Sequence, residues 1–369
     1  MQVKRMRVAL LCATGMAFGA LAAPASAEKI EGQYICVFQP SLVAKGAVRA
    51  EAAKSAAQGG GAVTHTYQNT IRGFAMNASA QGMAKMMAHN PRIAYCEQDQ
   101  VMTTVQGKPG GGSTPPAETT PWGVTRVGGG LTGSTRKAWV IDTGVDYTHP
   151  DLNVNTALSK TFIARTESAD DDNGHGSHVG GSNGALKDNG IGYVGVAPGV
   201  SLVAVKVLDR RGSGSNSGVI AGVDYAGGAF AAGDVANMSL GGGFSQALND
   251  AVIAAAAKGL KFALAAGNES TSATTKSPAS ANGPNIYTIS SFAQGDRWSS
   301  FSNYGNPPVD FAEPGSSIPS TYKDGGYATL SGTSMAAPHM AGLLLLGTPR
   351  SGGTVTGDPD GNADTIGIN

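Results

Sequence analysis

The sequence predicts two folded units: a small α+β domain, followed by an α/β domain whose mostly parallel central sheet has helices on both faces. Strand and helix patterns alternate beyond residue 117, whereas a different order of patterns occupies residues 28–106. The Gly/Pro/Ser stretch GKPGGGSTPP separates the two regions. Because this stretch sustains neither a helix nor a strand, we assign residues 107–117 to an exposed linker that is open to cleavage.

Short apolar runs in the second region indicate fully buried strands. They lie at residues 138–141, 202–207, 235–238 and 262–266. Helices are predicted between them at 217–226 and 246–258, and the second has apolar residues on one face and stops at Gly259. This alternation is typical of a parallel sheet covered on both faces, and binding sites in such sheets form at the carboxyl ends of the strands.

Residues 28–106 show the order strand, helix, strand, strand, helix, strand. The strands are expected near 34–38, 63–68, 71–76 and 93–97, and the helices over 41–57 and from a Ser79 cap to Asn90. This order is typical of a ferredoxin-like α+β domain, in which the first and last strands are neighbours. Cys36 and Cys96 lie on those two strands, so they either pair or remain buried free thiols.

The first 27 residues have the composition of a secretory signal. Three basic residues precede an apolar run over 8–22, and the small residues of Ala25-Ser26-Ala27 form a cleavage site. The run has about 15 residues, fewer than the roughly 20 that span a bilayer, so a retained anchor is the weaker alternative. We therefore expect a secreted, extracellular protein. Its second region, residues 118–369, contains no cysteine and depends on core packing.

The charge pattern argues against two classes of partner. The formal net charge is zero, with 26 basic and 26 acidic side chains, so no global field favours nucleic acid or an anionic membrane. Residues 28–117 carry a net charge of +3 and residues 118–369 carry −6. Opposite signs favour association of the two regions, although ordinary surface variation also produces such a difference.

Three segments of the second region carry residues that suit nucleophilic catalysis. Asp142 follows a buried strand, the motif of His175 lies between a polar loop and a helix of small residues, and Ser334 starts another helix. A hydroxyl becomes a nucleophile when a base takes its proton, and the base needs a third group to hold its tautomer. Each residue alone is more often a cap, a turn residue or a structural hydrogen-bonding residue. The combination of all three favours a catalytic role.

The three motifs, VIDTG at 140–144, NGHGSH at 173–178 and GTSMAAP at 332–338, resemble those of the subtilisin-type serine peptidases, the subtilases. The order Asp, His, Ser distinguishes this family from chymotrypsin-like enzymes and α/β-hydrolases. Residues 28–106 are similar to the subtilisin propeptide, an inhibitory domain that also templates folding. The resemblance implies that residues 118–369 form a secreted serine endopeptidase, which cuts its own precursor near residues 102–117.

The resemblance also implies a role for each residue of the site. Asp142 orients the base His175, and Ser334 is the nucleophile. Asn268 matches the asparagine whose side-chain N–H, together with the backbone N–H of Ser334, binds the oxyanion. His178 matches a structural position beside the triad. These roles imply acyl transfer without a catalytic cofactor.

Glycine-rich segments match the substrate-binding edges of the family. The residues are Gly212, Ser213, Gly214, Ser239, Leu240, Gly241, Ala265 and Gly267. Glycine permits a peptide backbone to approach closely enough to add itself as a strand. No buried charge is evident in the pocket walls, so we expect broad specificity with apolar or aromatic residues before the cut bond. Glu269, near the pocket mouth, is expected to tolerate a cation as well.

The strong calcium site of the family has partial counterparts. Asp151 matches its carboxylate ligand, Asn189 matches its amide ligand, and Glu118 stands where an N-terminal side chain completes the shell. Oxygen ligands from three distant segments suit Ca²⁺, and the ion would tie the N-terminus of the mature enzyme to its body. The alternative is that Asp151 caps a helix and Glu118 is solvated.

Two other functions stay open on the sequence alone. His175 and His178 follow three acidic residues at 170–172, which suggests a metallohydrolase, although no HExxH motif occurs. The second alternative is a catalytically silent binding protein of the same fold. The chain departs from the family at Ser177, where threonine is usual, and beyond Leu346, where an irregular sequence replaces a helix. We expect a monomer that acts on protein or peptide substrates.

Overall fold

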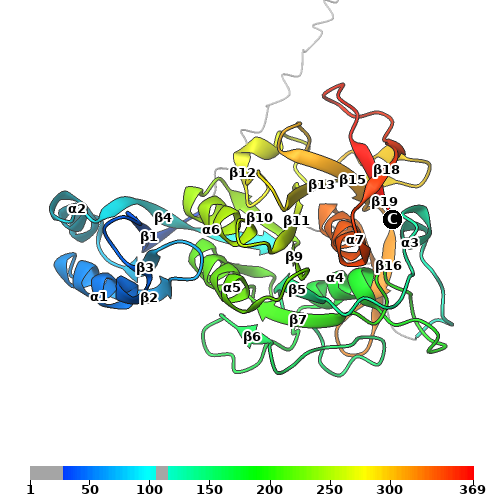
Figure 1. Cartoon of the computed structure of the whole chain (residues 1–369), viewed down its shortest axis with the longest axis horizontal. Helices are drawn as coiled ribbons and strands as arrows, with labels where there is room; N and C mark the ends of the chain where they lie inside the picture. Colours follow the sequence, from blue (N-terminus) through cyan, green and yellow to red (C-terminus); the bar gives the residue numbers. More distant parts are fainter. Residues whose placement is uncertain (1–27, 105–114) are drawn as a thin grey trace, which may run out of the picture.

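The computed structural model describes residues 28–104 and 115–369 (Figure 1). The expected signal over 1–27 and most of the linker lie outside these residues. Within the described ranges, no helix combines the length and the apolar character that a membrane crossing requires. A small N-terminal domain lies beside a larger α/β domain, and the last strand of the first domain enters the second.

The N-terminal domain has the predicted order of elements. They are β1 (Lys29–Phe38), α1 (Val48–Gln58), β2 (Ala62–Tyr67), β3 (Gly73–Asn77), α2 (Ala80–His89) and β4 (Ile93–Thr104). The antiparallel strands follow the order β4-β1-β3-β2, so the first and last strands are neighbours. Ser79 caps α2 as expected, because its side chain accepts a hydrogen bond from the Gly82 N–H at 3.1 Å.

A disulfide links the first and last strands of this domain. Cys36 and Cys96 are direct cross-strand partners on β1 and β4, and their sulfur atoms are bonded. Of the two alternatives that the sequence left open, the structure adopts the bonded one. The bond lies against the aromatic pair Phe38 and Phe74, within the core that α1 and α2 cover.

The larger domain confirms the predicted α/β class. Its sheet follows the order β18-β19-β15-β13-β11-β9-β5-β7-β6, and every pair from β19 to β6 is parallel. The strands are β5 (Lys137–Asp142), β6 (Lys160–Thr161), β7 (Ser201–Lys206), β9 (Val235–Met238), β11 (Lys261–Ala265), β13 (Ile286–Ala293), β15 (Val309–Pro314), β18 (Arg350–Thr354) and β19 (Thr365–Ile368). The short β14 (Arg297–Trp298) pairs with β13, and β16 (Ile318–Thr321) pairs with β17 (Tyr327–Leu330). Beyond Leu346 the irregular sequence forms the β18–β19 hairpin.

Helices cover both faces of this sheet (Figure 1). They are α3 (Trp122–Arg126), α4 (His175–Gly184), α5 (Asn216–Ala229), α6 (Gln246–Ala256) and α7 (Thr333–Leu346). Trp139 and Ile141 of β5 pack in the same core as α5 and α6, whereas Ala138 and Val140 pack with α4 and α7. Because successive side chains of a strand point to opposite faces, α4 and α7 share one side of the sheet, and α5 and α6 share the other.

The end of β4 joins the two domains. It lies between β8 (Ser213–Ser215) and β10 (Leu240–Gly243), and β10 pairs in turn with β12 (Lys276–Ser277). The sequence predicted a strand that stops at residue 97, because the stretch from Gln98 to Thr104 is largely polar. The extension is stabilised by backbone hydrogen bonds to the other domain, which a local pattern cannot reveal.

Candidate active site

Asp142 and His175 form a buried hydrogen-bonded pair at the carboxyl end of the central sheet. Asp142 is the last residue of β5, and its Oδ1 lies 2.7 Å from His175 Nδ1. The same oxygen accepts the Thr143 N–H at 2.7 Å. Both side chains are fully buried. The acid therefore fixes the orientation of the imidazole and leaves Nε2 as its free edge, with no hydrogen-bond partner among the described residues.

The turn that presents His175 requires glycine. Gly174 has φ of +110°, and a Cβ atom there would lie 2.3 Å from the Tyr322 ring. A side chain would be strained by the backbone and blocked by the ring. His175 is thereby the first residue of α4, whereas the sequence placed the whole motif, residues 173–178, before the helix.

Ser334 lies in the first turn of α7, at the helix start that the sequence predicted, but its hydroxyl has a different partner from the one that the resemblance implies. Its Oγ donates to the Ser239 carbonyl at 3.0 Å rather than to His175. Ser239 Oγ in turn donates to the Ser334 carbonyl at 2.8 Å. The helices α4 and α7 pack against each other, so both side chains belong to one layer. The Asp–His contact is formed in this structure, and the Ser–His contact is not.

The orientation of Asn268 suits an oxyanion donor. Its Oδ1 accepts hydrogen bonds from the Thr333 N–H at 2.9 Å and the Thr333 hydroxyl at 3.0 Å. These contacts use the carbonyl oxygen of the amide and leave the Nδ2 hydrogens for another acceptor. Sequence reasoning missed Thr333, although its position immediately before Ser334 in the motif was a visible signal.

The predicted substrate-binding edges hold the end of β4. Met102 pairs with Gly214, and Thr103 pairs with both Ser213 and Gly241. Beyond these pairs, the Thr104 N–H donates to the Gly212 carbonyl at 2.9 Å. Leu240, of the other edge, pairs with Thr104. A backbone segment of the chain itself therefore occupies the slot that the sequence assigned to a peptide substrate.

Glycines line the slot where the side chains of β4 come closest to its edges. A Cβ atom on Gly212 would lie 2.9 Å from the Thr104 hydroxyl oxygen, and one on Gly242 would lie 2.7 Å from Met102 Sδ. Gly267 has φ of +110°, and its Cβ would meet Asn303 Nδ2 at 2.2 Å. Ala265, in the same predicted wall, is buried at the end of β11.

Glu269, which the sequence placed near the pocket mouth, has two neighbours within the protein. Lys276 Nζ lies 3.1 Å from Glu269 Oε1, and Asn303 Nδ2 donates to Oε2 at 2.7 Å. Both carboxylate oxygens are therefore engaged by the protein. A cationic substrate side chain would therefore share this carboxylate with Lys276 and Asn303.

Two carboxylates of β4 cap helices of the larger domain. Glu97 accepts hydrogen bonds from the Ser245 hydroxyl and from the Gln246 N–H at 3.1 Å, at the start of α6. Asp99 accepts the Ser217 N–H at 3.1 Å and the Ser217 hydroxyl at 2.5 Å, at the start of α5. Negative charge at a helix N-terminus is stabilising. Sequence reasoning missed both residues, because a cap on a helix of another domain leaves no local signal.

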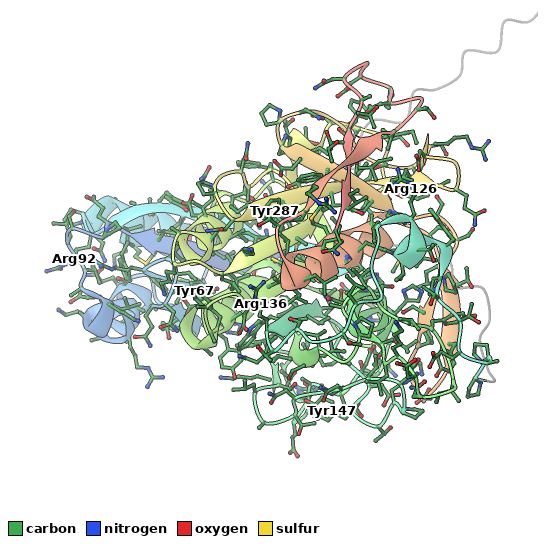
Figure 2. The ribbon with its side chains drawn as sticks, turned by 45° about the vertical axis from the view of Figure 1, so that its right-hand side comes forward. Tyr67, Arg92, Arg126, Arg136, Tyr147 and Tyr287 are labelled. Atoms are coloured by element: carbon green, nitrogen blue, oxygen red, sulfur yellow. A yellow bond between two sulfur atoms is a disulfide. The ribbon has the colours of Figure 1, made fainter. Side chains whose placement is uncertain are left out.

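Contacts also run from the larger domain to the smaller one. Asp224 of α5 accepts the backbone N–H groups of Asn69 and Thr70, both at 2.7 Å. The Tyr67 hydroxyl donates to the Ser217 carbonyl at 3.0 Å, and Figure 2 shows Tyr67 where the two domains meet. The side of the sheet that lacks α1 and α2 thus lies against α5.

The three candidate calcium ligands lie together, but they are joined by hydrogen bonds. Asn189 Nδ2 donates to Asp151 Oδ1 at 2.7 Å, and Glu118 Oε2 accepts the backbone N–H groups of Asn189 and Gly190 at 2.8 and 3.1 Å. Burial raises the pKa of Asp151, so a cation beside this carboxylate would be favourable. Asp151 and the Asn189 side chain fit an ion that prefers oxygen once the Asn189 amide is flipped, so that its Oδ1 faces Asp151. The Glu118 carboxylate is instead bound to backbone N–H groups of the loop.

A second histidine is held away from the base. His178 Nε2 contacts the Ile318 carbonyl at 3.0 Å, and burial lowers the pKa of His178 to about 3. His175 and His178 thus have different partners. Across residues 28–104 and 115–369, no three His, Cys, Asp or Glu side chains are arranged to hold a metal ion.

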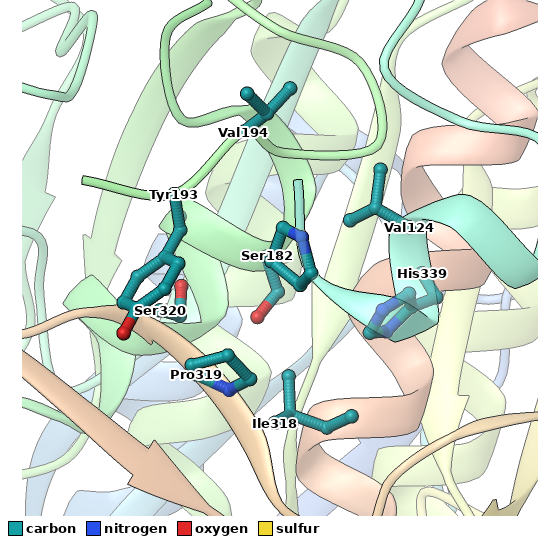
Figure 3. A pocket seen from close by; sticks show the side chains of 10 residues that line it. Val124, Ser182, Tyr193, Val194, Ile318, Pro319, Ser320 and His339 are labelled. Carbon is teal, nitrogen blue, oxygen red and sulfur yellow. The ribbon is translucent and has the colours of Figure 1, made fainter. Parts of the chain in front are cut away.

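A small pocket lies apart from these residues, between α4, α7 and β16 (Figure 3). Ser182, Tyr193, Ile318 and His339 are among its lining residues. His339 Nδ1 contacts the Met335 carbonyl at 2.8 Å, and burial lowers the pKa of His339 to about 4. None of Asp142, His175 and Ser334 lines this pocket.

Comparisons with known proteins agree with this geometry. Residues 137–349 match the Subtilase family. The chain is 40% identical to alkaline serine exoprotease A of Vibrio alginolyticus over 296 residues. This alignment covers 77% of this chain and 53% of that protein. It is 42% identical to subtilisin-like protease 6 of Trichophyton schoenleinii over 294 residues. This alignment covers 73% of this chain and 69% of that protein.

A solved structure extends the comparison to the fold. The crystal structure of a cold adapted subtilisin-like serine proteinase matches with a TM-score of 0.59 and 36% identity, over 67% of this chain and 97% of that one. The chain spans about half the length of the Vibrio relative. The family match covers more than half of the chain and contains Asp142, His175, Asn268 and Ser334. This chain belongs to the subtilase family of subtilisin-like serine proteases.

Proposed function

We propose that this chain is the precursor of a secreted serine endopeptidase of broad specificity. The observation that carries the proposal is the position of β4, which lies between β8 and β10 as an added strand. An extended backbone between two strand edges is the way in which many proteins bind peptides. The Asp142–His175 pair at 2.7 Å supplies the base for the reaction.

In the proposed mechanism, Ser334 Oγ attacks the peptide carbonyl carbon while His175 Nε2 takes the hydroxyl proton. Rotation of the Ser334 side chain turns Oγ from the Ser239 carbonyl toward His175. Asp142 stabilises the imidazolium that forms, and Asn268 Nδ2 with the Ser334 N–H binds the oxyanion. His175 then protonates the leaving amine. Water attacks the acyl-enzyme with His175 as its base, which releases the carboxyl product and restores the hydroxyl.

Broad specificity is proposed because backbone contacts dominate the slot. The pairs of Met102 and Thr103 with β8 and β10 are made by main-chain groups, which every peptide has. The residues that occupy the slot, Met102 to Thr104, are all uncharged. We propose apolar or aromatic residues before the cut bond.

The N-terminal domain is proposed to act as an inhibitor and a folding template for the enzyme. Glu97 and Asp99 hold it on the N-termini of α5 and α6, and β4 fills the slot that a substrate needs. The first cut is proposed just beyond β4, in the linker, after which the enzyme acts as a monomer. Export through residues 1–27 belongs to the same proposal.

A structural Ca²⁺ ion is proposed at Asp151 and Asn189. When bound, the ion would supply positive charge beside the buried Asp151 carboxylate and tie the loop around Asn189 to the body of the enzyme. Glu118 already holds this loop to the N-terminal segment through its hydrogen bonds to Asn189 and Gly190. The ion has no part in the chemical steps.

The experiment compares the purified precursor with its Ser334→Ala variant. Both are incubated with a fluorophosphonate, and intact masses are recorded. We expect one adduct on a shortened wild-type species and an unmodified, uncut variant. A folded wild-type chain that takes no adduct would remove the serine peptidase and leave the metallohydrolase and the silent binding protein as alternatives. A variant that still matures in pure form would remove self-cleavage.

A further inference from the structure

Lys206 has a buried ammonium group that the proposed mechanism does not use. The residue is 1% exposed, although lysine is almost never fully buried unless it is paired. Removing an ammonium group from water is costly, so its partners must compensate for the loss. Lys206 ends β7 and is the register partner of Asp142 at the end of β5. The buried charge is therefore next to the acid of the site.

The ammonium joins two segments that carry the acid and the base. Lys206 Nζ donates to the Thr143 carbonyl at 2.5 Å and to Asp172 Oδ1 at 2.6 Å. Thr143 directly follows Asp142, and Asp172 lies three residues before His175. A single buried ammonium group thus connects the end of β5 with the loop that leads into α4.

Thr143 is held on its other side by neutral and ionic hydrogen bonds. Its hydroxyl donates to Asp171 Oδ1 at 2.9 Å and accepts the Gly176 N–H at 2.9 Å. Asp171 also accepts the Gly174 N–H at 2.9 Å, at the start of α4. The side chain of Thr143 is therefore tied to the helix of His175, and its carbonyl is tied to Lys206.

We propose that Lys206 is a positioning residue for catalysis, which holds Asp142 and His175 in register by binding Thr143 and Asp172. This inference rests on the proposed peptidase function. Lys206 touches neither the substrate nor the reacting atoms, so its loss displaces the pair without removing a catalytic group. A displacement of about 1 Å in an active site lowers turnover about a hundredfold.

The test compares Lys206→Met with Lys137→Met in the mature enzyme. Lys137 is the matched control, because it begins β5, the strand that Asp142 ends, and pairs with the buried Asp234 at 3.1 Å. With a peptide substrate, we expect Lys206→Met to lower kcat about a hundredfold while KM changes little. Lys137→Met should leave both constants near those of the wild type. A Lys206→Met enzyme with wild-type kcat, or with an effect confined to KM, overturns the inference.

Asp172→Ala supplies a second variant if Lys206→Met does not fold. The Asp172 side chain is 47% exposed, so its removal creates no internal cavity. We expect kcat to fall about tenfold, as for the loss of one hydrogen bond to a charged group, with KM unchanged. Wild-type kcat in this variant would contradict the inference. Wild-type enzyme that reacts with the fluorophosphonate keeps the proposed function intact in either case.

Discussion

The two domains of this chain complete their cores by different means. The large domain has helices of its own on both faces of its sheet, whereas α1 and α2 cover only one face of the small one. On the other face, Ile35, Val37 and Ala75 pack in the same core as residues of α5 and α6. The small domain thus covers one face of its sheet with its own helices, and the large domain supplies the helices that cover the other face. The two domains also differ in crosslinking: the small domain contains the disulfide, and residues 118–369 contain no cysteine.

The largest expected effect removes the crosslink of the small domain. Cys36 and Cys96 are separated by 60 positions, and closing a loop of that size stabilises a chain by about 4 kcal/mol in the loop-entropy account. We expect Cys36→Ser with Cys96→Ser, in the inactive Ser334→Ala chain, to raise hydrogen exchange in β1 to β4 while the central sheet stays protected. Equal loss of protection in both domains would break the comparison.

The next effect concerns the large domain alone. Asn268→Ala removes the proposed oxyanion donor, and the loss of one such donor lowers kcat about a hundredfold, or about 3 kcal/mol. KM should change little, because the donor acts on the transition state. The affinity of the isolated small domain for the mature enzyme, measured by inhibition, should also be unchanged. A variant with weakened inhibition would mean that Asn268 supports the slot itself.

Acid should destabilise the large domain through its buried histidines. Burial lowers the pKa of His178 to about 3 and that of His339 to about 4, from 6.5, so the unfolded state binds their protons first as the pH falls. Their contribution to stability is complete above pH 6.5 and is lost toward the folded pKa values. Between pH 7 and 5 each histidine lowers the free energy of unfolding by about 2 kcal/mol.

This pH dependence is measured by urea unfolding of the Ser334→Ala chain at both pH values. In His339→Asn, the difference between pH 7 and 5 should shrink by about 2 kcal/mol. The control is His89→Asn, since His89 is exposed on α2 and should leave the difference unchanged. An unaltered difference in His339→Asn would show that other groups govern the acid transition.

The smallest effect is that of calcium. At a free concentration ten times Kd, a bound ion stabilises the folded chain by about 1.4 kcal/mol. Chelation should therefore lower the melting temperature slightly, and Asp151→Asn should abolish that response. Immediate and complete loss of activity on chelation would instead point to a metal in the chemistry and revive the metallohydrolase alternative.

Much of the fold was predictable because its signals are local. The apolar runs of β5, β7, β9 and β11 and the Ser79 cap each depend on a few adjacent residues. The end of β4 was missed because its stabilising partners, β8 and β10, are distant in the sequence. Helix α5 extends to Ala229, beyond the predicted end at 226, and Phe230, the residue that follows it, packs against the core.

The site was predictable in identity but not in detail. The motifs indicated Asp142, His175, Ser334 and Asn268, and the first two are in contact. The partner of the Ser334 hydroxyl depends on a rotamer, which a motif does not specify. Glu97 and Asp99 were missed for another reason. Their hydrogen-bond donors lie about 120 to 150 positions away, and an acidic side chain with a distant partner looks like a solvated one.

The proposed substrate slot between β8 and β10 has a consequence for which proteins the enzyme can digest. Two strand edges accept only a segment that is already extended, and a folded protein offers one only when it opens locally. Susceptibility then depends on how often a target unfolds rather than on its composition. The same holds for other copies of the enzyme. The mature domain has no disulfide, so it resists digestion by other enzyme molecules only while its loops stay folded.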